Sequence, residues 1–168
     1  EGLHQIGPQG QVPPAMLIFM LNVLLLKARY DPPWAAMFSS VLTVIPPFGP
    51  LFRRYFGPRT TSATLGDTVR FYDPPLIEAG RNVQFGHDCW FTAHHFDNRG
   101  MYIAKITIGD HAVIGGGALI MAGVEIGHHA VVGVRSLVMP NTKIAPYEYW
   151  AGTPAKKIKD MQPGEDGA

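Results

Sequence analysis

The chain has 168 residues and a formal net charge of +1 at pH 7, which suits one domain with a sizeable core. This small charge gives no basis for a nucleic-acid-binding surface or a disordered acidic tail. The single cysteine excludes an intramolecular disulfide framework, and the 19 Gly and 15 Pro residues predict many turns. The first residues lack the basic start of a signal peptide, so we expect a location in the cytoplasm. No initiator Met is present, so we expect a processed chain or a fragment.

Residues 1–60 form an apolar lead-in that prolines interrupt. Residues 15–30 are strongly apolar, but their uninterrupted part, 15–26, is shorter than the roughly 20 apolar residues that span a bilayer. Residues 51–57 mix aromatic side chains with two arginines, as segments at a membrane surface do. We therefore expect short helices in this part of the chain. Two interpretations of residues 15–57 stay open, namely packing against the following domain and contact with a membrane surface.

A six-residue period runs without a break through residues 108–143. The blocks read IGDHAV, IGGGAL, IMAGVE, IGHHAV, VGVRSL and VMPNTK. Such a period predicts a β-helix, in which each block supplies a short strand and a corner. Three blocks make one triangular coil, so side chains 18 residues apart should stack at about the 4.8 Å spacing of paired strands. The expected columns are Ile108 with Ile126 and Ile144, Ile114 with Val132 and Trp150, and Ile120 with Val138.

An earlier coil is predicted from the blocks AGRNVQ, FGHDCW and FTAHHF, which begin at Ala79 and follow a less regular stretch from Leu65. Cys89 falls at the inward fifth position of its block, which predicts a small core residue. Phe91 and Ile108 are 17 residues apart, which is not a multiple of six, so a loop is predicted at about 97–107. The β-helix should then extend over residues 61–160, and the polar tail 161–168 should fray.

Histidines are the candidate catalytic groups, because the chain has no GxSxG motif and no setting for a nucleophilic cysteine. His94 and His95 lie at the base of the predicted loop, where binding and catalytic residues concentrate, and Asp97 follows them. A neutral imidazole can take a proton from a hydroxyl group, and a carboxylate such as Asp97 could fix the tautomer and orientation of the ring. The remaining histidines are expected to be solvated surface side chains: His4, His87, His111, His128 and His129.

Residues 65–160 resemble the hexapeptide-repeat acyltransferases of the maltose/galactoside and xenobiotic O-acetyltransferase type. The resemblance is carried by FTAHHFD (91–97), ITIGDHAVIGGGALIMAGVEIG (106–127) and WAGTPAKKIKD (150–160). It implies a left-handed parallel β-helix, a homotrimer, and acetyl-CoA bound in the groove between two subunits, with no metal. It also implies a catalytic histidine just before a projecting loop. An HxxD pattern assigns this role to His94, whereas alignment on Thr92-Ala93 assigns it to His95.

The same resemblance implies a set of acetyl-CoA contacts. Lys156 and Lys157 would lie near the phosphates, and the glycine corners would line the pantetheine arm. Arg135 adjoins these corners where the family usually has a small residue, and Lys105 stands where a proline often precedes the strand, so either could alter the groove. The residues implied to contact the cofactor are Gly115, Gly116, Gly117, Gly133, Arg135, Lys156 and Lys157.

The leading hypothesis is therefore an acetyl-CoA-dependent O-acetyltransferase that acts directly on a sugar or another hydroxyl acceptor. The first 60 residues loosely resemble the lead-ins of polysaccharide acetyltransferases, which suggests a location at the inner face of the membrane. One alternative is a non-enzymatic β-helix that serves as a trimerising or membrane-docking module. Another is a zinc enzyme similar to the gamma-carbonic anhydrases, although the GHxxxxH spacing is broken because Gly133 follows His128 by five residues.

Overall fold

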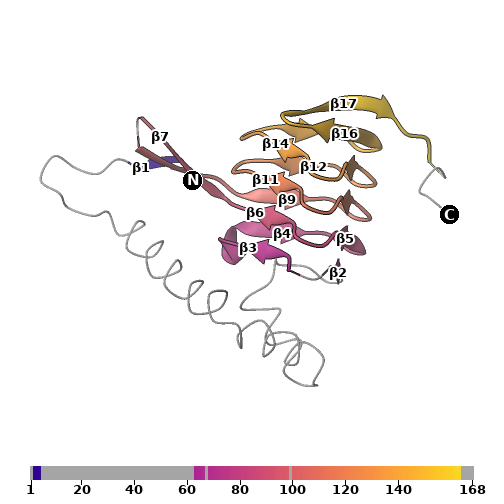
Figure 1. The fold of residues 1–168 in the computed structure, drawn as a ribbon, viewed down its shortest axis with the longest axis horizontal. Helices are drawn as coiled ribbons and strands as arrows, with labels where there is room; N and C mark the ends of the chain where they lie inside the picture. Colours follow the sequence, from indigo (N-terminus) through magenta and orange to yellow (C-terminus); the bar gives the residue numbers. More distant parts are fainter. Residues whose placement is uncertain (1, 5–62, 67, 99, 164–168) are drawn as a thin grey trace, which may run out of the picture.

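The computed structural model describes residues 2–4, 63–66, 68–98 and 100–163, with residues 2–4 described as backbone only. The main body is a prism whose three sides are sheets of short parallel strands (Figure 1). The predicted all-β class, a parallel β-helix, is thus confirmed. The helices predicted within residues 1–60 lie outside the described residues, and no helix in the described part is long and apolar enough to cross a membrane.

Each side of the prism is crossed once per coil. One side contains β3 (Arg70–Phe71), β6 (Trp90–Phe91), β11 (Leu119–Ile120) and β14 (Leu137–Val138). The second contains β4 (Ile77–Ala79), β9 (Ile106–Ile108), β12 (Glu125–Ile126) and β15 (Lys143–Ile144), and the 3-10 helix η1 (Pro74–Leu76) precedes β4. The third contains β2 (Ala63–Leu65), β5 (Val83–Phe85), β10 (Val113–Ile114), β13 (Val131–Val132), β16 (Glu148–Gly152) and the antiparallel β17 (Ala155–Asp160).

The strand register confirms the columns expected from the six-residue period. Ile126 pairs with both Ile108 and Ile144. The other two columns have the predicted pairs as well, including Val132 with Trp150. The coil predicted from Ala79 is also present, since Ala79, Phe85 and Phe91 pair with Ile108, Ile114 and Ile120.

The core is aliphatic in the upper coils and aromatic at the lower end. Phe71, Phe85 and Phe91 pack against one another with ring centroids 5.0 to 5.6 Å apart, in one stacked and two edge-on contacts. Such pairs contribute about 0.5–1.5 kcal/mol each beyond the burial of their surface. Cys89 is fully buried, as predicted, and burial raises the pKa of its thiol, so it remains a protonated core group.

Successive coils approach so closely at their corners that a side chain cannot always be accommodated. A Cβ on Gly115 would lie 2.5 Å from the backbone nitrogen of Val134 in the next coil. This contact explains glycine at the second position of the repeat block, directly after the inward aliphatic residue. A larger residue there would push two coils apart and break the hydrogen bond that the Gly115 N–H donates to the Val132 carbonyl.

The outer surfaces of the first two sides differ in polarity. We call the first side the apolar face, because Trp90, Leu119 and Leu137 form an outward column in register, with Arg70 below them. We call the second side the charged face, because its outward column consists of Glu78, Thr107, Glu125 and Lys143. Ion pairs join Lys143 to Glu125 at 2.9 Å and Lys105 to Glu78 at 2.6 Å.

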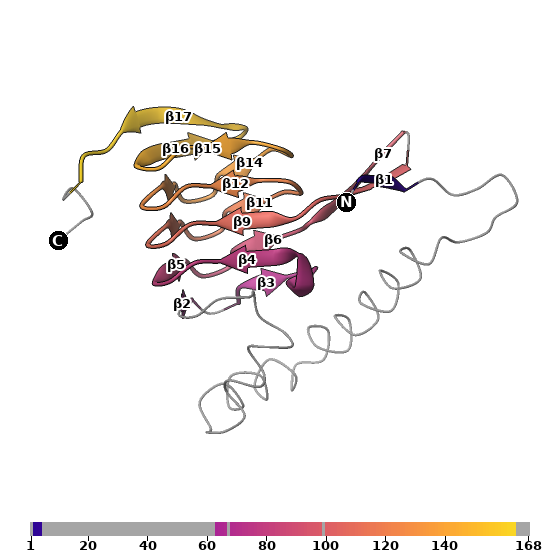
Figure 2. The same cartoon turned by 180° about the vertical axis from the view of Figure 1, so that it is seen from behind.

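A β-hairpin leaves the prism at the corner between these two faces (Figure 2). It consists of β7 (His94–Asp97) and β8 (Gly100–Ile103), and β1 (Gly2–His4) pairs antiparallel to β8. The projecting segment therefore begins and ends earlier than the predicted loop at 97–107, since residues 106–108 already form a strand of the prism. The 17-residue spacing revealed an insertion but did not show where it starts.

Glu148 ties the last two strands together. Its carboxylate accepts hydrogen bonds from the Lys157 amino group at 2.8 Å, from the Trp150 indole at 2.8 Å and from the Ala145 N–H at 2.9 Å. The hydrogen bond from Lys157, supported by those from Trp150 and Ala145, lowers the pKa of Glu148. A lowered carboxyl pKa stabilises the fold above the ordinary value of about 4.3, and this contribution is lost as the pH falls through the lower folded value.

We therefore expect Glu148→Gln to lower the stability at pH 7 by about 1–2 kcal/mol, because a neutral amide replaces an acceptor in charge-assisted hydrogen bonds. The difference in melting temperature between the wild type and this variant should shrink below about pH 4, where the wild-type carboxylate becomes protonated. Thermal unfolding followed by circular dichroism between pH 3 and 8 measures this difference. A difference that stays constant over the whole range would contradict the role given to the Glu148 charge.

Candidate active site

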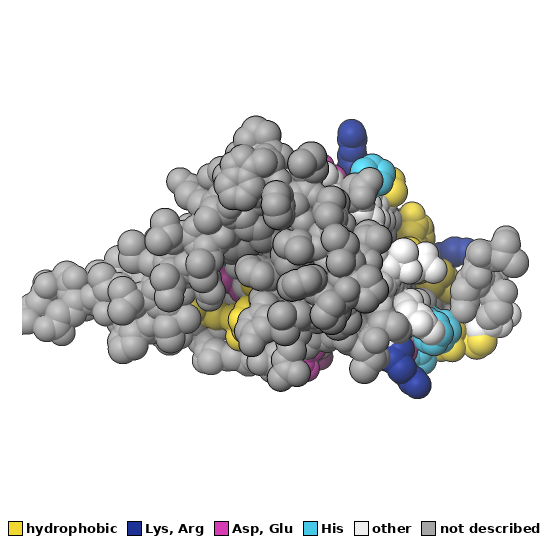
Figure 3. Space-filling model, turned by 90° about the horizontal axis from the view of Figure 1, so that it is seen from below, with side chains coloured by type: hydrophobic (Ala, Val, Ile, Leu, Met, Phe, Trp, Pro, Cys, Tyr) yellow, Lys and Arg dark blue, Asp and Glu magenta, His cyan; other side chains and the backbone are white. Residues whose placement is uncertain are grey.

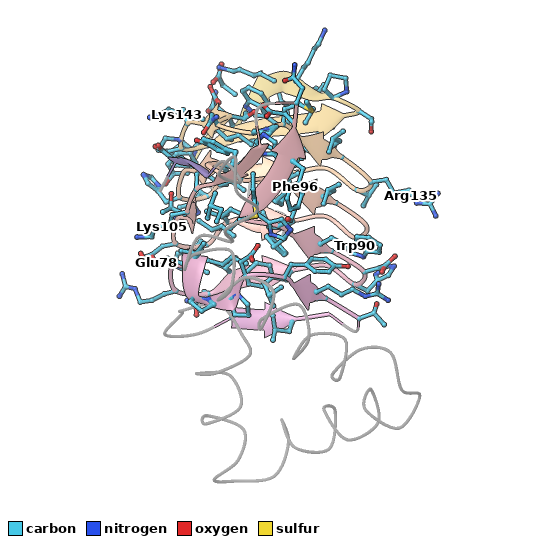
Figure 4. All side chains as sticks on the ribbon, turned by 90° about the vertical axis from the view of Figure 1, so that its left-hand side faces the viewer. Glu78, Trp90, Phe96, Lys105, Arg135 and Lys143 are labelled. Carbon is cyan, nitrogen blue, oxygen red and sulfur yellow. The ribbon has the colours of Figure 1, made fainter. Side chains whose placement is uncertain are left out.

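The hairpin is anchored where it leaves the prism. The Ala104 N–H donates a hydrogen bond to the Ala93 carbonyl at 3.0 Å, which closes the neck of the hairpin. The Gly123 N–H in the coil above donates to the Ala104 carbonyl at 3.3 Å, so the neck is also held from the next coil. Viewed along the hairpin, Phe96 faces the reader, Trp90 and Arg135 lie on one side, and the charged-face residues lie on the other (Figure 4).

A buried carboxylate and an imidazole meet at the base of this hairpin. The Nδ1 atom of His94 lies 2.6 Å from the Oδ2 atom of Asp73, which also accepts a hydrogen bond from the Ala93 N–H at 2.9 Å. The side chains of Asp73 and His94 are only 8% and 15% exposed. The Thr92 hydroxyl donates to the His94 carbonyl at 2.8 Å, which fixes the backbone at the start of β7. The imidazole is therefore held from both its ring and its backbone.

This geometry determines which nitrogen of His94 is available for proton transfer. With the Asp73 carboxylate at Nδ1, the stable neutral tautomer carries its proton on Nδ1 and donates it to Asp73. The Nε2 atom then carries the lone pair and can accept a proton from a hydroxyl group. A carboxylate in this position also stabilises the imidazolium that forms after the transfer. This arrangement would suit a general base that is held by a positioning carboxylate.

Asp73, and not Asp97, holds the His94 ring. Side chains alternate between the two faces of a strand, so Asp97 is on the opposite face of β7 from His94. Asp73 was missed because it lies in a block whose sequence is irregular. The signal was nevertheless present, since Phe71 pairs with Phe91, and Asp73 and Ala93 each follow their phenylalanine by two residues. Neighbouring coils thus place Asp73 directly below the start of the hairpin.

His95 lies on the other face of the hairpin from His94. Its ring centroid is 5.0 Å from that of Tyr102, and the Tyr102 hydroxyl donates to Asn141 at 2.8 Å. The Nδ1 atom of His95 is buried and has no hydrogen-bond partner among the described residues. Since consecutive side chains of a strand point in opposite directions, His94 and His95 cannot act on the same atom. The contact with Asp73 favours His94 as the base.

Replacing His95 with phenylalanine should raise the stability by about 1 kcal/mol, because it removes a buried polar atom that lacks a partner and keeps a ring against Tyr102. Chemical denaturation of the wild type and of His95→Phe measures the change. The variant should also retain the acetyl-transfer activity that the sequence leads us to expect. Loss of turnover in a folded His95→Phe protein would restore His95 as the candidate base.

The residues implied to contact acetyl-CoA gather at one corner of the prism, where residues 115–117 and 133–135 precede β11 and β14. We call it the glycine corner. The Arg135 N–H donates to the Gly116 carbonyl at 2.8 Å, and the Thr153 hydroxyl donates to the Arg135 carbonyl at 3.3 Å, so the turn before β17 joins this corner. Arg135 and Lys156 are exposed and form no ion pair among the described residues. Arg135 and Lys156 are therefore suited to contact the phosphates of a ligand bound at the glycine corner.

Two of the implied cofactor residues are less suited to that role. Gly133 is buried, and a Cβ on it would lie 2.8 Å from the Cβ of Ala151 and 3.0 Å from the hydroxyl of Tyr149. Lys157 forms ion pairs with Asp160 at 2.6 Å and with Glu148 at 2.8 Å, and these hydrogen bonds, first that of Asp160, raise its pKa. Its charge is therefore already compensated within the chain.

His94 and the residues of the glycine corner do not meet within one chain. His94 follows the strands of the apolar face, whereas the glycine corner precedes them, so the width of that face separates the two groups. Only a ligand that lies across the apolar face, or the glycine corner of a second copy, could join them.

Of the other histidines, His4 belongs to β1 and pairs with Met101 of the hairpin, whereas the remaining four lie at the other corners of the prism. Histidine side chains are visible at two places in Figure 3. His87, His111 and His128 are exposed, as predicted, while His129 is partly buried between the stacked rings of His111 and Tyr147, at 4.8 and 4.9 Å. Among the described residues, no group of three or more histidine, cysteine or acidic side chains could hold a metal ion. The side chain of His4 is not described.

No protein-family model matches this sequence, and no curated protein matches it. Solved structures do match. A maltose O-acetyltransferase from Clostridium difficile 630 has 21% identity and a TM-score of 0.59, with 83% of this chain and 89% of that chain covered. A hexapeptide-repeat acetyltransferase from Vibrio cholerae complexed with acetyl-CoA has 18% identity and a TM-score of 0.56, with 90% and 92% covered. An N-acyltransferase variant, AntD from Bacillus cereus, in complex with dTDP and coenzyme A has 17% identity and a TM-score of 0.52, with 68% and 89% covered.

The chain has the fold of the hexapeptide-repeat acetyltransferases. The family resemblance noted from the repeat, the HxxD pattern and the WAGTPAKKIKD segment therefore extends to the three-dimensional structure. At these identities the likeness establishes the architecture, and the chemistry has to be argued from the site itself.

Proposed function

We propose that this protein is an acetyl-CoA-dependent O-acetyltransferase that acts on a sugar or another hydroxyl acceptor. The observation that carries the proposal is the Asp73–His94 pair, placed at the base of a hairpin on an acetyltransferase fold. The similar structures support it, since one is a maltose O-acetyltransferase and another was solved with acetyl-CoA bound.

In the proposed reaction the acceptor oxygen attacks the thioester carbonyl of acetyl-CoA directly. The Nε2 atom of His94 takes the hydroxyl proton as the C–O bond forms, and Asp73 stabilises the resulting imidazolium. A backbone N–H group stabilises the oxyanion. The C–S bond then breaks, the imidazolium returns the proton to the sulfur, and the ester and free coenzyme A leave. A covalent acyl-enzyme is not required, and Cys89, buried with a raised thiol pKa, is unsuited to form one.

We propose further that acetyl-CoA lies along the partly exposed glycines 115–117 of the glycine corner, with Arg135 and Lys156 at its phosphates. In a homotrimer the hairpin corner of one copy would face the glycine corner of the next, which would bring His94 to the thioester. The upper part of the apolar face supports such an assembly, because Met139 is 45% exposed and neighbours the apolar column. Analytical ultracentrifugation should give three times the chain mass, and a monomer that transfers acetyl groups would contradict this arrangement.

We also propose that residues 15–57 contact a membrane surface. Residues 15–57 combine apolar, aromatic and arginine side chains, which supports contact with the inner face of the membrane and a membrane-linked polysaccharide precursor as acceptor. Co-sedimentation of the full chain with anionic vesicles tests this contact. Binding that is unchanged after Arg53→Glu and Arg54→Glu would contradict an electrostatic component.

The transferase is tested by the release of free coenzyme A thiol from acetyl-CoA, with and without a panel of sugars. Acceptor-dependent release that requires His94 supports the proposal. If acetyl-CoA binds, as measured by isothermal titration calorimetry, but no member of a broad hydroxyl panel is acetylated, an N-linked or other acceptor class is favoured. Absence of acetyl-CoA binding would favour the non-enzymatic scaffold.

A further inference from the structure

The proposed general base lies on a hairpin that projects from the prism, so its position depends on how that hairpin is held (Figure 2). At the neck, the hydrogen bond to the coil above, from the Gly123 N–H to the Ala104 carbonyl, is long at 3.3 Å. A side-chain contact farther along the hairpin also reaches upward. The Tyr102 hydroxyl donates to the Oδ1 atom of Asn141 at 2.8 Å, the usual length for a hydroxyl donor. We call Tyr102 and Asn141 the latch.

The corner of the prism is shaped so that Asn141 can reach the hairpin from two coils above its neck. The Asn141 N–H donates to the Ala122 carbonyl in the intervening coil at 2.9 Å. Asn141 has a φ of 60°, in the left-handed region that asparagine adopts more readily than most residues. Gly123, 18 residues earlier, lies directly below it, and a Cβ on Gly123 would overlap the Asn141 Oδ1 atom. The absence of a side chain at Gly123 thus lets the Asn141 amide extend past one coil to Tyr102.

The latch and the Asp73–His94 pair hold opposite faces of the hairpin. Tyr102 pairs with His95 across the two strands, so its side chain lies on the face opposite that of His94. On one face His94 contacts Asp73 from the coil below, at 2.6 Å. On the other face Tyr102 contacts Asn141 from above. The hairpin is therefore clamped from both sides by side chains of the rigid prism.

We propose that Tyr102 and Asn141 are positioning residues for His94. This inference rests on the proposed transferase function. The latch does not touch the reactants in this scheme. It acts by preventing the hairpin from turning about its neck, which would move the Nε2 atom of His94 away from the acceptor hydroxyl. A displacement of about 1 Å at a reacting group can lower a rate by about 10²-fold, so a contact on the far face of the hairpin can control kcat.

Kinetics of the two latch variants test this role. Tyr102→Phe removes the donor and keeps the ring, and Asn141→Gly removes the acceptor and accepts the positive φ. Each should lower kcat about 3- to 10-fold, the range in which one neutral hydrogen bond shifts an equilibrium, and leave KM for acetyl-CoA unchanged. The double variant should lose no more than either single variant, because both remove the same bond. Asn141→Asp keeps an acceptor oxygen and should restore kcat to within about twofold of the wild type.

Hydrogen exchange of the full chain, followed by mass spectrometry, tests the latch without turnover. Amides of residues 94–103 should exchange about 3- to 10-fold faster in Tyr102→Phe and in Asn141→Gly than in the wild type, because the hairpin opens more often. Amides of β11 and β12 should keep their exchange rates. Asn82→Gly is the matched control, since it makes the same substitution at another left-handed asparagine, with a φ of 54°, at the corner between β4 and β5. It should change neither the hairpin exchange nor kcat.

The possible outcomes separate the latch from the reaction. Faster hairpin exchange together with a lower kcat, both restored in Asn141→Asp, supports the inference. Faster exchange with an unchanged kcat overturns the positioning role and leaves the transferase intact. Unchanged exchange in both latch variants overturns the latch, and a raised KM for acetyl-CoA in place of a lower kcat would assign these residues to cofactor binding and overturn it too. Absence of thiol release in the wild type overturns the transferase and the positioning role with it, while the exchange rates still decide whether the latch holds the hairpin.

Discussion

Replacing His94 with alanine should lower kcat for acetyl transfer by about 10²- to 10⁴-fold, the usual contribution of a general base. The loss should fall on kcat, because the imidazole acts on the acceptor proton during attack and is remote from the cations proposed to hold the phosphates. Steady-state release of the coenzyme A thiol at saturating acetyl-CoA measures kcat. Acetyl-CoA should still bind to His94→Ala with an affinity within a few-fold of the wild type.

His95→Ala is the matched control for this substitution, since it removes the same side chain one residue along the same strand. Its kcat should stay within a few-fold of the wild-type value, because His95 faces Tyr102 and not Asp73. Circular dichroism should show that both alanine variants keep the β-helix. If His95→Ala loses activity and His94→Ala retains it, the assignment of the base is reversed and Asp73 becomes a purely structural partner.

The repeat allowed most of the prism to be predicted from the sequence. Ile108, Ile126 and Ile144 were expected to share a column because they are 18 residues apart, and the strand register places them together. This worked because each coil repeats the same backbone geometry, so a position within the block determines the direction of its side chain. The same reasoning predicted the coil that begins at Ala79, and Ala79 does pair with Ile108.

The repeat was uninformative where the chain departs from it. The hairpin of β7 and β8 has a two-residue alternation, and its first residues, His94 and His95, also fit the last positions of the preceding block. The six-residue pattern was therefore continued past the true start of the hairpin, and the loop was predicted at 97–107, too far along the chain. The two strands are set by their antiparallel pairing with each other, a local contact with its own two-residue alternation that an analysis in six-residue blocks does not contain.

For the candidate site, the candidate residues were easier to predict than the side chains that contact them. His94 was chosen as a candidate because a histidine pair stands where the six-residue period fails. Its carboxylate was sought next to it in sequence, at Asp97, whereas the coils bring Asp73 from 21 residues away. Lys157 was expected to contact a phosphate of the cofactor, but it forms ion pairs with Glu148 and Asp160. The contact partners of a side chain depend on which residues of the coils above and below lie next to it. Predicting them requires the exact register of the strands.

Asp73→Asn should lower kcat by about 10²- to 10⁴-fold while KM for acetyl-CoA remains unchanged, because asparagine fills the same space without the charge that stabilises the imidazolium. Asparagine can also donate a hydrogen bond, which favours the tautomer of His94 with its proton on the wrong nitrogen. Asp73 does not touch the reactants in this scheme, so it is a positioning residue. Asp110→Asn is the control, since that carboxylate pairs with Arg81 on an exposed corner, at 2.9 Å.

A structural role for Asp73 would give a different result, so stability is measured with the rates. Asp73→Ala leaves the buried Ala93 N–H and the His94 ring without their acceptor, and should lower stability by about 1–3 kcal/mol as well as kcat. Asp73→Asn should retain most of the stability and still lose activity. If Asp73→Asn loses stability and activity in proportion, the carboxylate only supports the corner. If it keeps full activity, the base does not depend on Asp73.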